Sequence, residues 1–337
     1  GEIDQDLGNY ERFLDVDIPR KNNITTGQVY KTIIDKERSG KYLGQTVQFI
    51  PHVPDEIKRR VKDASKEHDI ALIEIGGTIG DYENIPFLFA MKSLERELGK
   101  DNVVYVLITY LPIPSHMEEM KTKPTQQAIR LLGENGIFPD FIICRAKKAL
   151  DSVRKKKIEI YANISSEHVI SEPDIDTIYS IPLDLEREKF GIKILNELKL
   201  KPKKELDLSE WKKLVSRIEK PKQTVKIAIV GKYIDIGDYS LADSYLSINQ
   251  ALIHSGASLN VGIDISWVDA KVFETNPNKT SDLKNFDGVI VPGGFGSSGV
   301  EGKIKAINFA RVNDKPYLGL CYGMQLAIVE YARNACN

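Results

Sequence analysis

The chain has few cysteines, no long apolar run and almost no excess of charge. Its 337 residues include three cysteines, Cys144, Cys321 and Cys336, which are too few for the disulfide framework of a small secreted domain. No apolar stretch approaches the length of a membrane span, and no signal peptide is visible. Basic and acidic side chains number 47 and 48, and the net charge of −1 argues against a general nucleic-acid binder. We therefore expect a cytoplasmic protein that binds neither a membrane nor nucleic acid.

Histidine, the usual base beside a catalytic cysteine, is also scarce, and none follows Cys321. The chain begins at Gly1 rather than at a methionine, directly inside an acidic motif. We therefore expect a fragment of a longer protein, truncated or only partly observed at both ends. The five histidines are His52, His68, His116, His168 and His254.

A chain of this length is expected to form two domains, and 42% hydrophobic with 28% charged residues is ordinary for a globular protein. In residues 1–200, apolar stretches typical of buried strands alternate with helical patterns. That alternation predicts a mostly parallel sheet covered by helices. The expected strands are residues 46–50, 70–75, 103–109 and 141–144, and the expected helices are residues 54–67, 85–98 and 125–132.

The composition changes between residues 201 and 224, where lysine and proline cluster on both sides of a short helix that carries Trp211. We interpret this stretch as an interdomain linker. Residues 225–337 again alternate strand and helix patterns, so the predicted fold class is α/β, with two doubly wound, mostly parallel-sheet domains. The strands expected in the second domain are residues 225–230, 261–267, 288–291 and 316–320, followed by a helix at residues 324–331.

The most informative motif surrounds Cys321, which stands between an expected strand and an expected helix with Gly319 and Gly323 on either side. A nucleophile on a tight strand-to-helix turn needs small neighbours, and a helix N-terminus favours the thiolate. Upstream, Gly294 lies in a glycine-rich turn whose backbone N–H groups are suited to receive an oxyanion. A lone cysteine is more often a buried structural thiol, but the two glycine turns together favour acyl transfer by Cys321.

Carboxylates at two places indicate a site for a divalent metal. Glu74 ends an expected strand beside Gly76 and Gly77, which let a ligand approach the backbone closely. Metal sites that also bind nucleotide phosphates commonly use one or two protein carboxylates. For Glu74, metal ligation is favoured over a plain strand-end carboxylate, whereas Asp6, taken alone, is more typical of a solvated loop.

A basic motif at residues 121–126 indicates an anion site. Pro124 suits the first turn of a helix, and two lysines precede it beside the unpaired backbone N–H groups of the helix start. Gln126 can read a base edge because its amide both donates and accepts. A capped helix with solvated lysines explains this motif equally well, and Lys157 alone resembles part of a solvated face.

Taken together, these motifs resemble those of the CTP synthase family, and the resemblance covers essentially the whole chain. It implies a P-loop-type synthetase domain in residues 1–200 and a class I glutamine amidotransferase domain of flavodoxin-like fold in residues 225–337. The motifs that carry it are residues 6–13 (DLGNYERF), 22–27 (NNITTG), 42–48 (YLGQTVQ), 74–81 (EIGGTIGD) and 121–126 (KTKPTQ), with the turns at Gly294 and Cys321.

The resemblance implies that ATP phosphorylates the 4-oxygen of UTP and that ammonia then displaces phosphate to give CTP. Glutamine would supply the ammonia through a thioester on the cysteine, and an internal tunnel would carry it. Two other readings stay open: an amidotransferase with another acceptor, and a non-catalytic paralogue that binds nucleotides.

The resemblance also implies roles for individual residues, with Mg²⁺ as cofactor and ATP as co-substrate. Cys321 matches the nucleophile. The other implied sites are Asp6 and Glu74 for Mg²⁺; Asp6, Pro173, Asp174 and Ile175 for ATP; Lys121, Thr122, Lys123, Pro124, Thr125, Gln126 and Lys157 for UTP; Asp81, Tyr82 and Glu83 for CTP as feedback inhibitor; and Gly294, Tyr322, Gly323, Met324 and Gln325 for glutamine and the oxyanion.

Several features depart from the family pattern. The glycine-rich phosphate loop and the histidine and glutamate partners of the cysteine are expected outside residues 1–337. Ser298 stands where the family usually has an arginine linked to activation by GTP, and residues 234–247 are a few residues longer than expected. The family also implies a homotetramer with nucleotide sites between subunits.

Overall fold

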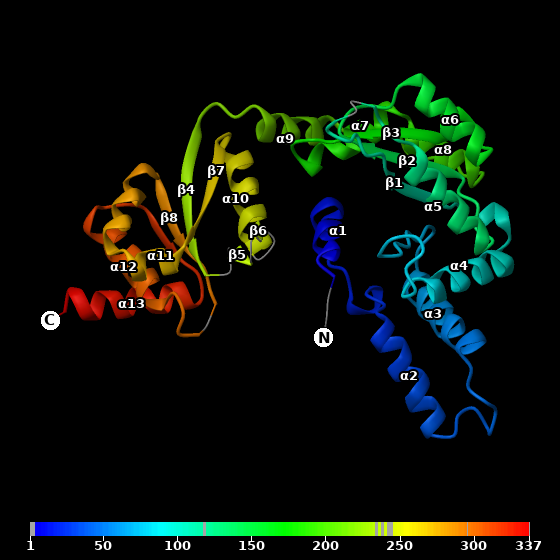
Figure 1. Cartoon of the computed structure of the whole chain (residues 1–337), viewed down its shortest axis with the longest axis horizontal. Coiled ribbons are helices and arrows are strands. Elements are labelled where there is room, and N and C mark those ends of the chain that lie inside the picture. Colours follow the sequence, from blue (N-terminus) through cyan, green and yellow to red (C-terminus); the bar gives the residue numbers. More distant parts are fainter. Residues whose placement is uncertain are drawn as a thin grey trace. The chain divides into compact units, whose positions relative to one another are not determined.

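The computed structural model describes residues 4–116, 119–232, 235–236, 239–240, 245–294 and 296–336. The chain divides into two compact units (Figure 1). The first unit comprises Gly1–Ile175 and Ile181–Glu205, and the second comprises Asp176–Ser180 and Leu206–Asn337. Among the described residues, no helix combines the length and apolarity needed to cross a bilayer.

The first unit contains eight α-helices and three strands among its described residues. In chain order these are α1 (Asp6–Leu14), α2 (Thr26–Arg38), α3 (Phe49–Ser65), α4 (Ile85–Leu98), β1 (Val106–Tyr110), α5 (Lys123–Glu134), β2 (Phe141–Ala146), α6 (Ser152–Ala162), β3 (Val169–Pro173), α7 (Ile181–Arg187) and α8 (Phe190–Glu197). Short 3₁₀ helices lie at Arg20–Asn22, Lys100–Asn102 and Ser166–His168.

The sheet of the first unit is parallel, in the order β1-β2-β3. Each pair of consecutive strands is joined through a helix, as a parallel sheet requires. Strand β2 is central and almost wholly buried, with Ile142 and Cys144 in the main hydrophobic core. Because the strands are parallel, the segments that follow β1, β2 and β3 all begin at one edge of the sheet.

Two predicted strands of this unit are absent. Residues 46–48 are irregular and Phe49 already begins α3, while residues 70–75 are irregular and leave Leu72 91% exposed. A strand needs a neighbour for its backbone hydrogen bonds, and none of the described residues pairs with either stretch. The local apolar pattern was therefore insufficient to predict these two strands.

The second unit has a four-stranded parallel sheet in the order β7-β4-β8-β9 and a small antiparallel pair, β5-β6. The predicted strands of this sheet are confirmed to within a few residues. Its elements are α9 (Ser209–Glu219), β4 (Thr224–Gly231), β5 (Asp235–Ile236), β6 (Tyr239–Ser240), α10 (Leu246–Leu259), β7 (Gly262–Asp269), α11 (Ala270–Thr275), β8 (Gly288–Val291), α12 (Val300–Val312), β9 (Tyr317–Gly319) and α13 (Tyr322–Asn334), with 3₁₀ helices at Ile178–Ser180 and Pro277–Asn285.

Helices cover both faces of this four-stranded sheet. Val230 and Val291 face a core shared with α11, α12 and α13. The neighbouring positions along β4 and β7 face the other way, and there Trp267 stacks on Tyr245 at a ring distance of 5.4 Å. Gly256 of α10 also approaches Ile263 of β7. The predicted doubly wound α/β class is thus confirmed.

Residues Asp176–Ser180 belong to the second unit although the segments on both sides of them belong to the first. Tyr179 anchors them: its hydroxyl contacts Gln250 at 2.7 Å and His254 at 2.6 Å, both on α10. The Trp211 indole donates to the Tyr179 carbonyl at 2.7 Å. Helix α9 thus packs within the second unit, inside the stretch that was expected to be a linker.

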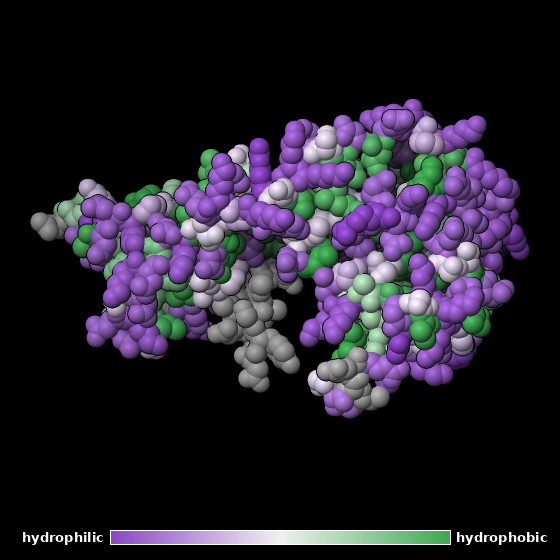
Figure 2. All heavy atoms as spheres, turned by 90° about the horizontal axis from the view of Figure 1, so that it is seen from above, coloured by the Kyte–Doolittle hydropathy of each residue, from purple (hydrophilic) through white to green (hydrophobic). Residues whose placement is uncertain are grey.

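Figure 2 shows that hydrophilic side chains cover most of the visible face.

Gly323 of α13 permits a close contact between this helix and β8, so Gly323→Ala should destabilise the second unit. A Cβ at this position would lie 1.9 Å from the Val291 carbonyl oxygen, so the helix would have to move. We expect a loss of about 3 kcal/mol in the free energy of unfolding, measured by urea denaturation. Gly27→Ala on α2 is the control, because nothing lies within 4 Å of that position and alanine there should be neutral or stabilising. Equal midpoints for Gly323→Ala and the wild type would contradict this packing.

Candidate active site

Cys321 occupies a strained turn between β9 and α13. Its backbone has φ 51° and ψ −109°, a combination rarely adopted by a residue with a side chain. Two hydrogen bonds hold the turn: the Leu320 N–H donates to the Val291 carbonyl at 3.0 Å, and the Gly323 N–H donates to the Leu320 carbonyl at 2.9 Å. The thiol is exposed at the carboxyl end of its strand. This is the arrangement expected of a nucleophile on a strand-to-helix elbow.

A close contact explains Gly319, and Gly293 lies within van der Waals distance of Cys321. A Cβ on Gly319 would lie 2.7 Å from the Met324 nitrogen, and one on Gly293 would lie 3.5 Å from the Cys321 Cβ and 3.8 Å from its Sγ. Strands β8 and β9 are neighbours, with Val291 opposite Gly319, so the turns that follow them meet. The structure therefore brings together the two glycine turns that the sequence singled out.

The turn after β8 offers backbone donors beside Cys321. Gly294 has φ 111°, which only glycine adopts easily, and Phe295 lies outside the described residues. Within the described part of the chain, the N–H groups of Gly293 and Gly294 have no hydrogen-bond acceptor. Such groups suit the binding of an oxyanion.

The remaining residues predicted to bind glutamine lie in the first turn of α13. Tyr322 is half-buried, while Met324 and Gln325 are exposed. The Gln325 N–H donates to the Cys321 carbonyl at 3.3 Å. Ser298 is exposed in the turn before α12. Much of the apparent insertion at residues 234–247 lies outside the described residues.

Lys303 is a buried cation beneath this site that the sequence analysis missed. It lies on α12, is 1% exposed, and its Nζ donates to the carbonyls of Pro292 at 3.1 Å and Gly293 at 3.2 Å. Burial, and secondarily the charge of Lys232, lowers the pKa of Lys303 to about 8. One signal was available: Ile307 and Ala310, four and seven residues later, form the buried stripe of the same helix.

In the first unit, the structure brings the two predicted metal ligands into electrostatic contact. Asp6 stands in the first turn of α1 and accepts from the Asn9 amide at 3.1 Å. Loss of hydration raises the pKa of Glu74, and the charges of Asp6 and Asp4 raise it further. Carboxylates that repel each other in this way fit a divalent cation. The described residues contain no group of three or more candidate metal ligands, so phosphate and water would have to complete the coordination.

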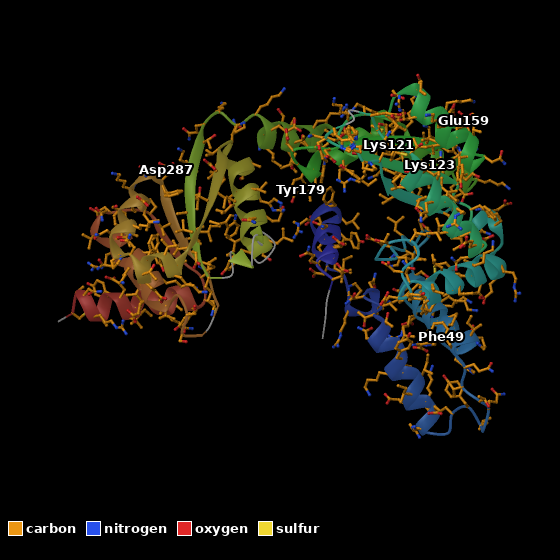
Figure 3. The ribbon with its side chains drawn as sticks, in the orientation of Figure 1. Phe49, Lys121, Lys123, Glu159, Tyr179 and Asp287 are labelled. Atoms are coloured by element: carbon orange, nitrogen blue, oxygen red, sulfur yellow. The ribbon has the colours of Figure 1, made fainter. Side chains whose placement is uncertain are left out.

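The basic motif is fixed to the end of β1. The Lys121 N–H donates to the Pro112 carbonyl at 2.9 Å, and the buried Thr125 hydroxyl contacts that of Thr109 at 3.0 Å. Thr122 precedes α5 without a side-chain cap, so the helix N-terminus is open to an anion. Figure 3 labels Lys121 and Lys123 where α5 begins.

Two further charged residues join this basic motif. Glu119 pairs with Lys121 at 2.7 Å and with Arg154 of α6 at 3.1 Å. The pKa of Glu119 is lowered, and Lys121 is the main cause. Lys157 is exposed one turn after Arg154 on the same helix. Neither Glu119 nor Arg154 was predicted, because their pairing depends on the meeting of two segments 35 residues apart. Such a cluster is suited to an anion that carries more negative charge than one carboxylate.

The predicted CTP segment forms an exposed loop. Asp81 accepts from the Thr78 N–H at 2.8 Å, and Tyr82 is 86% exposed, as is much of Glu83. A Cβ on Gly80 would lie 3.2 Å from Leu131 of α5, so this loop, which also carries Glu74, lies against the helix that follows the basic motif.

The predicted ATP segment follows β3 directly. Pro173 ends that strand, and the Asp174 N–H donates to the Ala146 carbonyl at 2.8 Å. Glu172, immediately before it, is 5% exposed, and burial raises its pKa. Neither of its carboxylate oxygens has a hydrogen-bond partner in the part of the chain that the structure describes. No pattern in the sequence singled out Glu172.

The structure therefore groups the predicted residues of the first unit into two clusters. The basic motif and residues 173–175 start from the same edge of the sheet, after β1 and β3. The carboxylates Asp6 and Glu74 interact with each other, but the described residues show no hydrogen bond or ion pair from them to Lys121 or Lys157.

Replacing Asp6 tests the electrostatic link to Glu74. Asp6→Asn removes a negative charge, so the pKa of Glu74 should fall toward its ordinary value while the effect of burial remains. Carboxyl chemical shifts followed against pH by NMR would measure this change. Asp15→Asn, beyond the other end of α1, is the control and should leave the Glu74 titration unchanged. An identical Glu74 titration in Asp6→Asn would separate the two carboxylates.

Comparisons with known proteins assign both units. Residues 1–200 match the family described as "CTP synthase N-terminus", and residues 240–337 match "Glutamine amidotransferase class-I". CTP synthase of Pyrococcus furiosus is 49% identical over 334 residues, which are 99% of this chain and 61% of that protein. CTP synthase of Methanopyrus kandleri is 48% identical over 336 residues, covering 99% and 62%.

One solved structure is also similar. It is described as "Trypanosoma brucei CTPS - glutaminase domain with bound acivicin" and is 41% identical over 33% of this chain and 41% of that one, with a TM-score of 0.30. The chain spans about 61% of the length of the curated relatives that it matches.

Proposed function

Because the chain belongs to the CTP synthase family, we propose that the protein aminates UTP to CTP, using ATP and ammonia from glutamine. The observation that carries this proposal is the strained turn of Cys321, which lies against Gly293. The N–H groups of Gly293 and Gly294 have no acceptor among the described residues. That geometry suits attack on an amide, and the matched family supplies the acceptor.

In the second unit, the Cys321 thiolate attacks the side-chain amide carbon of glutamine. A carbon–sulfur bond forms, and the carbonyl oxygen becomes an oxyanion, which the backbone N–H groups of the turn at Gly293 and Gly294 receive. The carbon–nitrogen bond then breaks, and nitrogen leaves as ammonia once it takes up a proton. Water hydrolyses the remaining thioester to glutamate and restores the thiol. Tyr322, Met324 and Gln325 line the start of the helix beside the substrate.

In the first unit, the anion site at the N-terminus of α5 binds the phosphates of UTP. Lys121, Lys123 and Lys157 supply positive charge, and a polyphosphate displaces Glu119 from Lys121 because it carries more negative charge. Gln126 is placed to read the uracil edge. Residues 173–175, at the end of β3, position ATP so that its terminal phosphoryl group reaches the 4-oxygen of UTP.

The carboxylates Asp6 and Glu74 would hold Mg²⁺ with the phosphates of ATP. A bound divalent cation supplies charge neutralisation during phosphoryl transfer. Burial chiefly raises the pKa of Glu74 and the charges of Asp6 and Asp4 raise it further, which supports this assignment because a cation would relieve that repulsion. Ammonia then displaces phosphate at C4. Sequestration favours that step, since ammonia released into water at neutral pH is mostly protonated and is not a nucleophile.

The family also supports proposals on regulation and assembly. CTP acts as a feedback inhibitor through Asp81, Tyr82 and Glu83, and GTP activates weakly because Ser298 replaces the usual arginine. The protein works in the cytoplasm as a homotetramer.

Cys321→Ala tests the division of labour. It should lower glutamine-driven CTP synthesis at least about a thousandfold, because the nucleophile is lost, and leave synthesis from added ammonium largely intact. CTP formation from UTP and ATP is the measurement, on the gene product at its natural length. Cys336→Ala, a second exposed cysteine, is the control. Glutamine consumption without CTP from UTP and ATP would favour another acceptor, and no turnover with either nitrogen source would favour a non-catalytic paralogue.

Glu74→Gln tests the metal assignment. The variant should lower both the glutamine-driven and the ammonium-driven rates about tenfold or more, because both need phosphoryl transfer, and raise the Mg²⁺ concentration for half-maximal rate. Glu134→Gln, an exposed carboxylate on α5, should leave both rates unchanged. Ammonium-driven synthesis at the wild-type rate and Mg²⁺ dependence would remove Glu74 from the metal site.

A further inference from the structure

We propose that Lys303 is a positioning residue that aims the N–H groups of Gly293 and Gly294 at the oxyanion formed on Cys321. The inference rests on the proposed glutaminase chemistry and adds a residue to it. Its basis is the pair of hydrogen bonds from the Lys303 Nζ to the consecutive carbonyls of Pro292, at 3.1 Å, and Gly293, at 3.2 Å.

Peptide planarity converts these bonds into an orientation. In a trans peptide the C=O and the N–H of one plane point in opposite directions. The carbonyl of Pro292 shares its plane with the N–H of Gly293, and the carbonyl of Gly293 shares its plane with the N–H of Gly294. By holding both carbonyls on the side of α12, Lys303 turns both N–H groups to the opposite side of the turn.

The surroundings of the turn make this restraint necessary. Gly294 and Gly296 both have φ 111°, so the turn lacks the stiffness that a Cβ gives a backbone. Gly293 lies against Cys321, since a Cβ placed on Gly293 would be 3.8 Å from the Cys321 Sγ. A small rotation of either peptide plane would therefore move a donor relative to the sulfur. A cation bonded to a carbonyl also polarises the peptide and strengthens its N–H as a donor.

The burial of Lys303 supports a specific task. A fully buried lysine is costly unless its charge finds partners. Among the described residues, its Nζ bonds to two carbonyls and to no carboxylate, and the nearby Lys232 adds repulsion. An apolar side chain of the same length would fill the space on α12 without that cost.

Lys305 provides a matched control on the same helix. Its Nζ also donates to two consecutive backbone carbonyls, those of Phe273 at 3.1 Å and Glu274 at 3.5 Å. These carbonyls lie in the last turn of α11 and not in the turn beside Cys321. Lys303→Met and Lys305→Met therefore remove equivalent bonds, only one pair of which reaches the site.

The experiment compares these variants in the gene product at its natural length. Lys303→Met should lower kcat for glutamine hydrolysis about tenfold to a hundredfold with KM changed less than about threefold, since the oxyanion exists only after attack. Ammonium-driven CTP synthesis should stay at the wild-type rate. Lys305→Met should leave the glutaminase kcat unchanged, and Lys303→Arg, which keeps donors, should recover part of the loss.

Glutamate γ-semialdehyde provides a readout that a merely structural role would not change. The Cys321 thiolate adds to its aldehyde carbon, the C=O electron pair moves to oxygen, and the resulting thiohemiacetal carries the same oxyanion with no leaving group. Its inhibition constant should rise in Lys303→Met in proportion to the fall in kcat. Alkylation of Cys321 by iodoacetamide, which forms no oxyanion, should keep its rate.

Three outcomes would overturn the proposal: an equal loss in both methionine variants, a fall in kcat without weaker semialdehyde binding, or slower alkylation. If Lys303→Met does not fold, Lys303→Gln replaces it, because its shorter side chain loses the same contacts. Failure of the proposed function is distinguishable, since the wild type would then show no glutamine hydrolysis that Cys321→Ala abolishes.

Discussion

The pairing of β8 with β9 is the constraint on which the second unit depends. These parallel neighbours end at the same edge of the sheet. The pairing itself therefore places the turn that carries Cys321 beside the turn that carries Gly293 and Gly294. The Leu320 N–H bonds directly to the Val291 carbonyl, and Gly323 lets α13 sit against the same carbonyl. One backbone oxygen of β8 thus fixes both the elbow and the helix behind it.

In the first unit, side chains of opposite charge gather at two separate places. Cations gather where α5 begins, around Glu119, while carboxylates gather where α1 begins and after residue 73. The proposed nucleotide and its Mg²⁺ would bring a charge of the opposite sign to each of these two clusters.

Several of these features could be predicted from residues near one another in the sequence. The strand before Cys321, the helix after it and the glycines around it form one local pattern, and α4 and β8 have the expected bounds. Residues 70–75 have an equally good local pattern, yet they are irregular, because a strand depends on its neighbour. Lys303 and Glu119 escaped prediction for a related reason: a lysine and a glutamate look like solvated charges until another segment's carbonyls or cations are placed beside them.

The backbone of Cys321 has a consequence for the stability of the second unit. Its φ of 51° with ψ of −109° is a conformation that glycine tolerates and other residues adopt at a cost of roughly 1–3 kcal/mol. Replacing the side chain by hydrogen would relieve that strain. Cysteine thus stands where glycine would be the more stable residue, and the elbow lowers the folding stability of this unit in return for an exposed sulfur.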